Sequence, residues 1–215
     1  MKLKFLMMLL ALACVGTAEA QRRILLGREV TTAEAARTLH DFARCVIIRA
    51  PGRARALLAM DFTSDEYQDR IRTFAQSYWQ CVPQGHRLGF SRLPFAGDLA
   101  EQLLLLDAHG ADLATQVAYD PARPPLAARS EQEAMALCAV RAAPQKVSAL
   151  LATRPFSAEE AGALRALTPE AQSCLAAGVR LSLNGIALRA MLGLAAYRLA
   201  EHNRAPATRS AAAGS

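Results

Sequence analysis

The chain has 215 residues, of which 53% are hydrophobic and 20% charged, and its formal net charge is +6 at pH 7. This balance supplies ample material for a buried core and excludes a disordered or collagen-like chain. The positive charge is almost all arginine, spread singly among acidic residues and without RNP-like aromatic motifs, so we predict no nucleic-acid partner.

The first 20 residues have the three-part pattern of a secretory signal peptide. Lys2 and Lys4 precede an apolar stretch over residues 5–15, and Ala18-Glu19-Ala20 offers the small residues of a cleavage site. We therefore predict a signal peptide over residues 1–20 and an exported protein, either periplasmic or secreted.

The alternative is a lipoprotein acylated at Cys14. Ala11 stands where the acylation motif normally has leucine, and this disfavours the alternative. After residue 20 no apolar run is long enough to cross a bilayer, so we predict no stable membrane span after cleavage.

Residues 21–106 are predicted to form a first unit of four short helices. The first helix is expected from Thr32 to Ile48, and the second opens at Pro51, because proline suits the first turn of a helix. Ser64 is the predicted N-cap of the third helix, and the fourth is expected from Ser91 to Leu106.

A linker over residues 107–129 follows, because this stretch contains Gly110, Pro121, Pro124 and Pro125. Residues 130–202 are predicted to form a second unit, which opens with Ser130 as N-cap. Within it we expect Pro169 to break the third helix and restart it. The polar tail over residues 203–215 is predicted to be disordered.

An internal duplication relates the two units at an offset of 93 residues. Aligning residues 45–106 with residues 138–199 without gaps gives sixteen identities in 62 positions. They include two cysteines, one proline, one glycine and the N-cap serine of the third helix, and chance agreement between alanines and leucines does not explain these.

One short alternating segment stands in each unit. It reads HisArgLeuGlyPhe at residues 86–90 and ValArgLeuSerLeu at residues 179–183. Alternation favours a strand, so we predict at most one short strand per unit, with the two segments pairing across a pseudo-two-fold axis.

Four cysteines remain after the predicted cleavage, and an even number in an exported protein indicates disulfides. Of the three possible pairings we favour the local one, Cys45–Cys81 and Cys138–Cys174. The alternatives are bridges between the units, or thiols that bind a metal. Zinc sites usually have closely spaced CxxC pairs or added histidines, so we predict neither a metal nor another cofactor.

The sequence has none of the nucleophile, metalloprotease, phosphate-loop or dinucleotide motifs of familiar enzymes. The four histidines, His40, His86, His109 and His202, have no counterparts in the other unit, and His40 and Asp41 are neighbours that point in different directions. We therefore predict no catalytic residues. An enzyme would need a site formed only by folding, such as His40 or His86 beside a carboxylate in a cleft.

The first unit is much richer in aromatic residues than the second. Buried packing is the simpler interpretation of aromatics at helical spacing. The functional alternative is a partner or ligand patch around Tyr67, Tyr78 and Trp79.

These patterns predict an all-α protein of two homologous units, each of about four short helices, related by a pseudo-two-fold axis. The favoured function is a non-catalytic periplasmic or envelope protein that binds an unknown protein or a small apolar ligand. The alternative is a small periplasmic enzyme whose carboxylate and histidine site forms only in the fold.

Overall fold

The structure is a computed structural model, and it describes residues 23–25, 28–30, 32–82, 91–108, 111–118, 120–121, 123–180 and 183–205. These parts are helical apart from a short antiparallel hairpin of β1 (Arg23–Leu25) and β2 (Arg28–Val30). The predicted all-helical class is confirmed. The signal peptide predicted over residues 1–20 lies outside the described residues.

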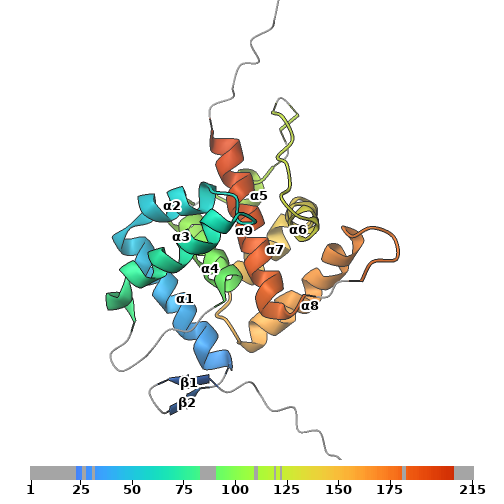
Figure 1. The fold of residues 1–215 in the computed structure, drawn as a ribbon. Helices are drawn as coiled ribbons and strands as arrows, with labels where there is room; N and C mark the ends of the chain where they lie inside the picture. Colours follow the sequence, from blue (N-terminus) through green and yellow to red (C-terminus); the bar gives the residue numbers. More distant parts are fainter. Residues whose placement is uncertain are drawn as a thin grey trace, which may run out of the picture.

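The helices of the first half are α1 (Thr32–Arg49), α2 (Pro51–Ala59), α3 (Asp65–Ser77), the 3-10 turn η1 (Trp79–Cys81) and α4 (Arg92–Asp107). Those that follow are α5 (Leu113–Gln116), α6 (Glu131–Ala142), α7 (Pro144–Leu151), α8 (Ala158–Ser173) and α9 (Gly185–Arg204). Figure 1 shows α9 in the middle, with α1 to α3 on one side and α6 to α8 on the other.

Local capping explains where several of these helices begin. The hydroxyl of Ser64 accepts a hydrogen bond from the amide of Tyr67 at 3.2 Å, and Ser157 accepts one from the amide of Glu160 at 3.1 Å. Ser130 caps α6 in the same way, as predicted. Each hydroxyl satisfies one of the amide groups that a helix leaves unpaired in its first turn.

Several predicted details differ in the structure. The helix α8 continues through Pro169 without a break, because Leu167 and Ala171 on either side of it are fully buried and hold the helix on the core. The predicted linker contains the helix α5, whose Leu113 is buried. The last helix, α9, extends past residue 202 to Arg204, and of the predicted tail residues 206–215 lie outside the described part.

The two predicted strands fall largely on residues that the structure does not describe. Residues 86–90 lie outside the described residues, as do residues 181–182, while Val179 and Arg180 have no regular secondary structure. The hairpin of β1 and β2 stands at a place where no strand was predicted.

Both predicted disulfides are confirmed. Cys45 is bonded to Cys81 and Cys138 to Cys174, each pair 36 positions apart. Each bridge ties the first helix of its half to the end of the third helix or the turn that follows it. Two such bridges indicate an oxidising environment for the folded protein.

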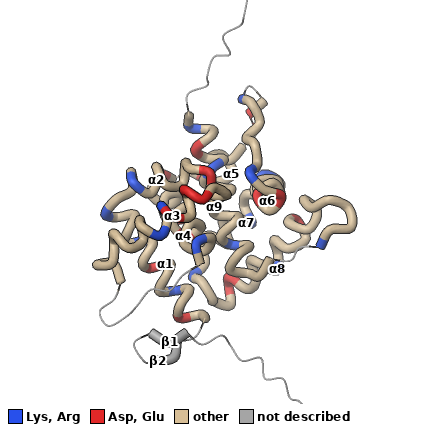
Figure 2. Tube along the Cα trace, in the orientation of Figure 1, with Lys and Arg blue, Asp and Glu red and all other residues tan. Residues whose placement is uncertain are grey.

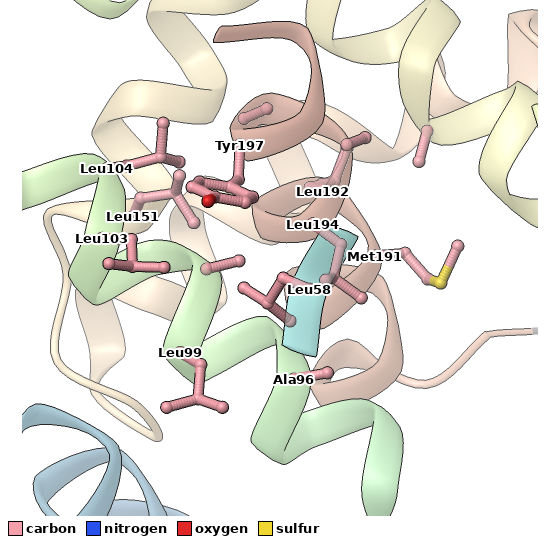
Figure 3. Close-up of a cluster of buried hydrophobic side chains, with 14 of the residues drawn as sticks. Leu58, Ala96, Leu99, Leu103, Leu104, Leu151, Met191, Leu192, Leu194 and Tyr197 are labelled. Atoms are coloured by element: carbon pink, nitrogen blue, oxygen red, sulfur yellow. The ribbon is translucent and has the colours of Figure 1, made fainter. Parts of the chain in front are cut away.

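The core is centred on the pair formed by α4 and α9. Figure 3 shows Leu99, Leu103 and Leu104 of α4 together with Leu192 of α9, and Leu58 of α2 also contributes. Around this pair, α1 packs on α4 and α6 packs on α9. The described helices include none that is both long enough and apolar enough to cross a membrane.

The two central helices cross at Gly97. A Cβ atom added there would lie 2.4 Å from the Cα of Ala190 and 2.6 Å from its Cβ. At such a close approach only a hydrogen fits between the two backbones, so Gly97 sets the distance between α4 and α9.

We expect Gly97→Ala to lower the free energy of unfolding by about 1–3 kcal/mol, because the added methyl forces the two helices apart. Gly52→Ala is the matched control, since nothing lies within 4 Å of a Cβ at Gly52 in α2. That change should raise stability by about 0.5–1 kcal/mol through helix propensity. Urea unfolding measures both, and a Gly97→Ala protein as stable as the parent would contradict the close crossing.

Candidate functional site

A cavity of about 360 Å³ lies beside the crossing of α4 and α9. Its lining comes from α1, α4, α8, α9 and the turn between α7 and α8. Apolar side chains make much of the wall, among them Ala36 and Leu39 of α1 and Ile186 and Ala187 of α9. Asp98, Glu101, Glu160 and Arg189 also line it, so charged groups face an otherwise apolar hollow.

The acidic side of this site comes from one face of α4. Asp98 and Glu101 are three residues apart, so their side chains leave the helix on the same side. That side faces α1 and α9. Because Gly97 lets α9 approach closely, Arg189 can reach Glu101 across the helix pair.

Arg189 is 5% exposed and is fully engaged by its surroundings. Its Nε and Nη2 donate to the two carboxylate oxygens of Glu101 at 3.1 and 2.7 Å. Its Nη1 donates to Oε1 of Glu160 at 3.0 Å and to the hydroxyl of Thr153 at 2.9 Å. Such a buried guanidinium is tolerated because charged and polar partners surround it.

His40 of α1 belongs to the same cluster of polar side chains as Asp98 and Glu101. Its Nδ1 lies 3.2 Å from Oδ1 of Asp98 and 3.9 Å from Oε1 of Glu101. The amide nitrogen of Gln102 lies 3.2 Å from the other ring nitrogen, Nε2. Both ring nitrogens therefore have a protein partner, and Asp98 holds the ring in place.

Burial and charge set the titration of these groups. Burial raises the pKa of Asp98 and of Glu101, although His40 and Arg189 oppose the shift. The pKa of His40 is also raised: burial by itself lowers it, but the hydrogen bond to Asp98 and the nearby carboxylates outweigh that effect. Asp98, Glu101 and His40 thus take up protons at a higher pH than the same groups would in water.

The rim of the cavity includes a strained residue. Phe156 has a φ of 57°, in the left-handed region that is unfavourable for residues other than glycine. Its amide donates to Oε2 of Glu160 at 2.5 Å, and its carbonyl accepts from Nη2 of Arg37 at 2.9 Å. These bonds hold the turn between α7 and α8 against α1 and fix the carboxylate of Glu160.

A metal ion is one ligand that this geometry suggests. One ligand atom each of His40, Asp98 and Glu101 lie within 4.8 Å of one another, and these are common ligand types. However, both oxygens of Glu101 are bonded to Arg189, and Nδ1 of His40 is bonded to Asp98. An ion would have to displace these bonds next to a guanidinium.

For the aromatic residues of the first half, the structure favours the simpler interpretation of buried packing over the alternative of a patch around Tyr67, Tyr78 and Trp79. Tyr67 and Tyr78 are 3% and 7% exposed and belong to the core, so they cannot form a surface with Trp79, which is 75% exposed. Tyr78 packs against Phe74, at 5.0 Å between ring centroids. Aromatics at helical spacing here fill the space between helices.

His40 beside a carboxylate was considered as the alternative enzyme site, whereas Arg189 and Glu101 were not predicted, although the sequence contains a signal for them. Arg189 stands alone in the apolar run GlyIleAlaLeuArgAlaMetLeu, and Glu101-Gln102 stand directly before four leucines. Polar residues inside an apolar helix are expected to need partners when buried. The sequence does not show which partners, because Arg189 and Glu101 are 88 positions apart.

Comparison with known proteins identifies no relative, since no family model, curated protein or solved structure matches the chain.

Proposed function

We propose that this protein is an exported helical repeat protein that binds a small apolar ligand in the cavity. The observation that carries the proposal is the cavity itself, with apolar walls and a few convergent polar groups, which is the usual composition of small-molecule sites. Its volume of about 360 Å³ lies near the lower end of the roughly 300–1,000 Å³ of such sites, which favours a small ligand.

The proposed duplication has support from the helix boundaries. The helices α7, α8 and α9 begin 93 residues after α2, α3 and α4, which is the offset of the sequence repeat. Ala50 and Ala143 also share an uncommon backbone conformation before the prolines that open α2 and α7, with φ and ψ of −150° and 55° and of −140° and 56°. The helix contacts follow the same scheme, since α1 packs on α4 as α6 packs on α9.

The cavity would then be an asymmetric feature of a repeated fold. At the offset of 93, Asp98 and Glu101 correspond to Met191 and Leu194. The two carboxylates of α4 therefore have apolar counterparts in α9, which supports a specialised role for this face of α4.

Export is supported by two observations of different kinds. The sequence opens with the pattern of a signal peptide, and the structure contains two disulfides. Disulfides persist in oxidising compartments such as the periplasm or the extracellular space. We propose one of these as the site of action.

A small acid–base enzyme is the second candidate, because His40 lies beside Asp98 and Glu101 next to a cavity. A general base needs a free nitrogen or oxygen within reach of its substrate. Both ring nitrogens of His40 are already bonded, one to Asp98 and the other to Gln102. Only a carboxylate therefore remains to act as the general base. The geometry therefore favours binding over catalysis.

Ligand binding is tested with the neutral fluorescent probe N-phenyl-1-naphthylamine. We expect the protein to bind it, and Ala187→Phe to weaken binding at least about tenfold, because the phenyl ring occupies the cavity. Ala134→Phe on the exposed face of α6 is the matched control and should change nothing. Equal affinity in all three folded proteins would refute this site.

A further inference from the structure

We propose that the ligand of the cavity is an organic cation, with an ammonium group that binds Asp98 and an apolar body that lies along α1 and α9. This inference rests on the proposed function and adds the chemical class of the ligand. It follows from the charge of the cavity, from the bonding of each carboxylate and from the nature of the walls.

The charged side chains at the cavity do not neutralise one another. Three carboxylates, those of Asp98, Glu101 and Glu160, surround the single guanidinium of Arg189. Even with His40 protonated, negative charge remains in excess. A positively charged ligand would neutralise it in a place where water is largely excluded and the interaction is correspondingly strong.

The three carboxylates differ in how many hydrogen bonds they already accept from the protein. Arg189 binds both oxygens of Glu101, while Glu160 is shared between Arg189 and the amide of Phe156. Among the described residues, only His40 donates a hydrogen bond to Asp98, through Oδ1. Asp98 also lines the cavity, so it is the carboxylate that keeps acceptor capacity for a ligand.

The apolar walls of the cavity favour an organic cation over a metal ion as the ligand. Ala36, Leu39, Ile186 and Ala187 give a hydrated ion no oxygen ligands, but they suit a hydrocarbon body. An ammonium group needs only hydrogen-bond acceptors, and it can bind Asp98 while Arg189 stays on Glu101. An apolar amine therefore fits both the apolar walls of the cavity and the carboxylate of Asp98.

Protonation should control this binding. A cation binds the charged form of Asp98, and the groups that face it are His40 from α1, Glu101 from α4, Glu160 from α8 and Arg189 from α9. Because burial raises the pKa of Asp98, protons compete with the ligand at a higher pH than for an exposed carboxyl. Affinity for the cation should fall as the pH falls.

The test compares two probes of nearly the same shape, 1-naphthylmethylamine and 1-naphthylmethanol, by calorimetric titration of the intact protein. The amine is positively charged from pH 5 to pH 8 and the alcohol is neutral. At pH 8 we expect the amine to bind about 10- to 100-fold more tightly than the alcohol, because it forms a charge-assisted hydrogen bond. This preference for the amine should shrink at pH 5.

Asp98→Asn should remove the preference without removing the cavity. The amide oxygen of asparagine can still accept from His40, and the alcohol should keep its affinity. The matched control is Asp107→Asn in the same helix α4, where Asp107 binds Arg55 and Arg204 away from the cavity. That protein loses the same charge and should keep the preference for the amine.

The outcomes separate this inference from the proposed function. Equal binding of amine and alcohol in the parent protein overturns the cation but leaves a ligand-binding cavity. Binding of neither probe, together with no binding of N-phenyl-1-naphthylamine, overturns both. Zn²⁺ binding that is lost in Asp98→Asn, with no preference for the amine, would make the site a metal centre and also overturn the inference.

Discussion

Arg189→Met is expected to lower the free energy of unfolding by about 3–5 kcal/mol at pH 7, because it leaves two buried carboxylates without their cation. Glu101 loses both hydrogen bonds that its carboxylate accepts from Arg189, and Glu160 loses one. Methionine fills much of the same space, so the effect reports the lost charge rather than an empty volume. Urea unfolding with the disulfides intact measures it.

The loss should depend on pH with a defined sign. The pKa of Glu101 is raised by burial even with Arg189 present, and removing Arg189 raises it further. An acid whose folded pKa is raised contributes stability below its unfolded pKa and loses that contribution as the pH rises through the folded value. The deficit of Arg189→Met should therefore be smaller at pH 5 than at pH 7.

Two further variants serve as controls for this prediction. Arg70→Met removes an exposed arginine that pairs with Glu66 at 3.6 Å, and it should change stability by no more than about 0.5 kcal/mol. Adding Glu101→Gln to Arg189→Met should recover part of the loss, because a neutral amide is less costly to bury than a carboxylate. Equal stability of the Arg189→Met and Arg70→Met proteins would contradict the buried charge group.

Removing either disulfide should destabilise the protein by about 2–5 kcal/mol. Each bridge joins cysteines 36 positions apart, and a closed loop of that length restricts the unfolded chain by about 4 kcal/mol in the chain-entropy description. We expect Cys45→Ala with Cys81→Ala, and Cys138→Ala with Cys174→Ala, each to show this loss in urea unfolding. A loss below 1 kcal/mol for both pairs would contradict the role of the bridges.

The two bridges should differ in how easily they are reduced. Cys138 is exposed on α6, whereas its counterpart Cys45 is half-buried; Cys81 and Cys174 both pack against the core. A reducing thiolate reaches an exposed sulfur more readily. Mild reductant should therefore open Cys138–Cys174 first, as seen by alkylation and intact mass at successive times, and opening of Cys45–Cys81 first would be the contrary result.

Features that depend on neighbouring residues were predictable from the chain alone. The serines that cap α3, α6 and α8 and the prolines that open α2 and α7 act through bonds or backbone angles within a single turn. The disulfide pairing was also predictable, because closing a short loop costs less entropy than closing a long one.

Features that depend on packing were predicted less well. Pro169 alone favours a break, but Leu167 and Ala171 are buried by other helices and keep α8 continuous. The helical spacing of Tyr67 and Tyr78 favoured a core but did not exclude a surface patch. Their burial is decided by residues far away in the chain, which supply the opposing side of the contact.

By itself, the sequence of this protein predicted the helical class, several of the helix starts and the cysteine pairs, which the structure confirms. Only the tertiary structure decided that His40 meets Asp98 across 58 positions and that Arg189 meets Glu101 across 88. The first contact exists because α1 packs on α4, and the second because α4 and α9 cross closely at Gly97. Such crossings depend on how several helices pack at once rather than on any local pattern.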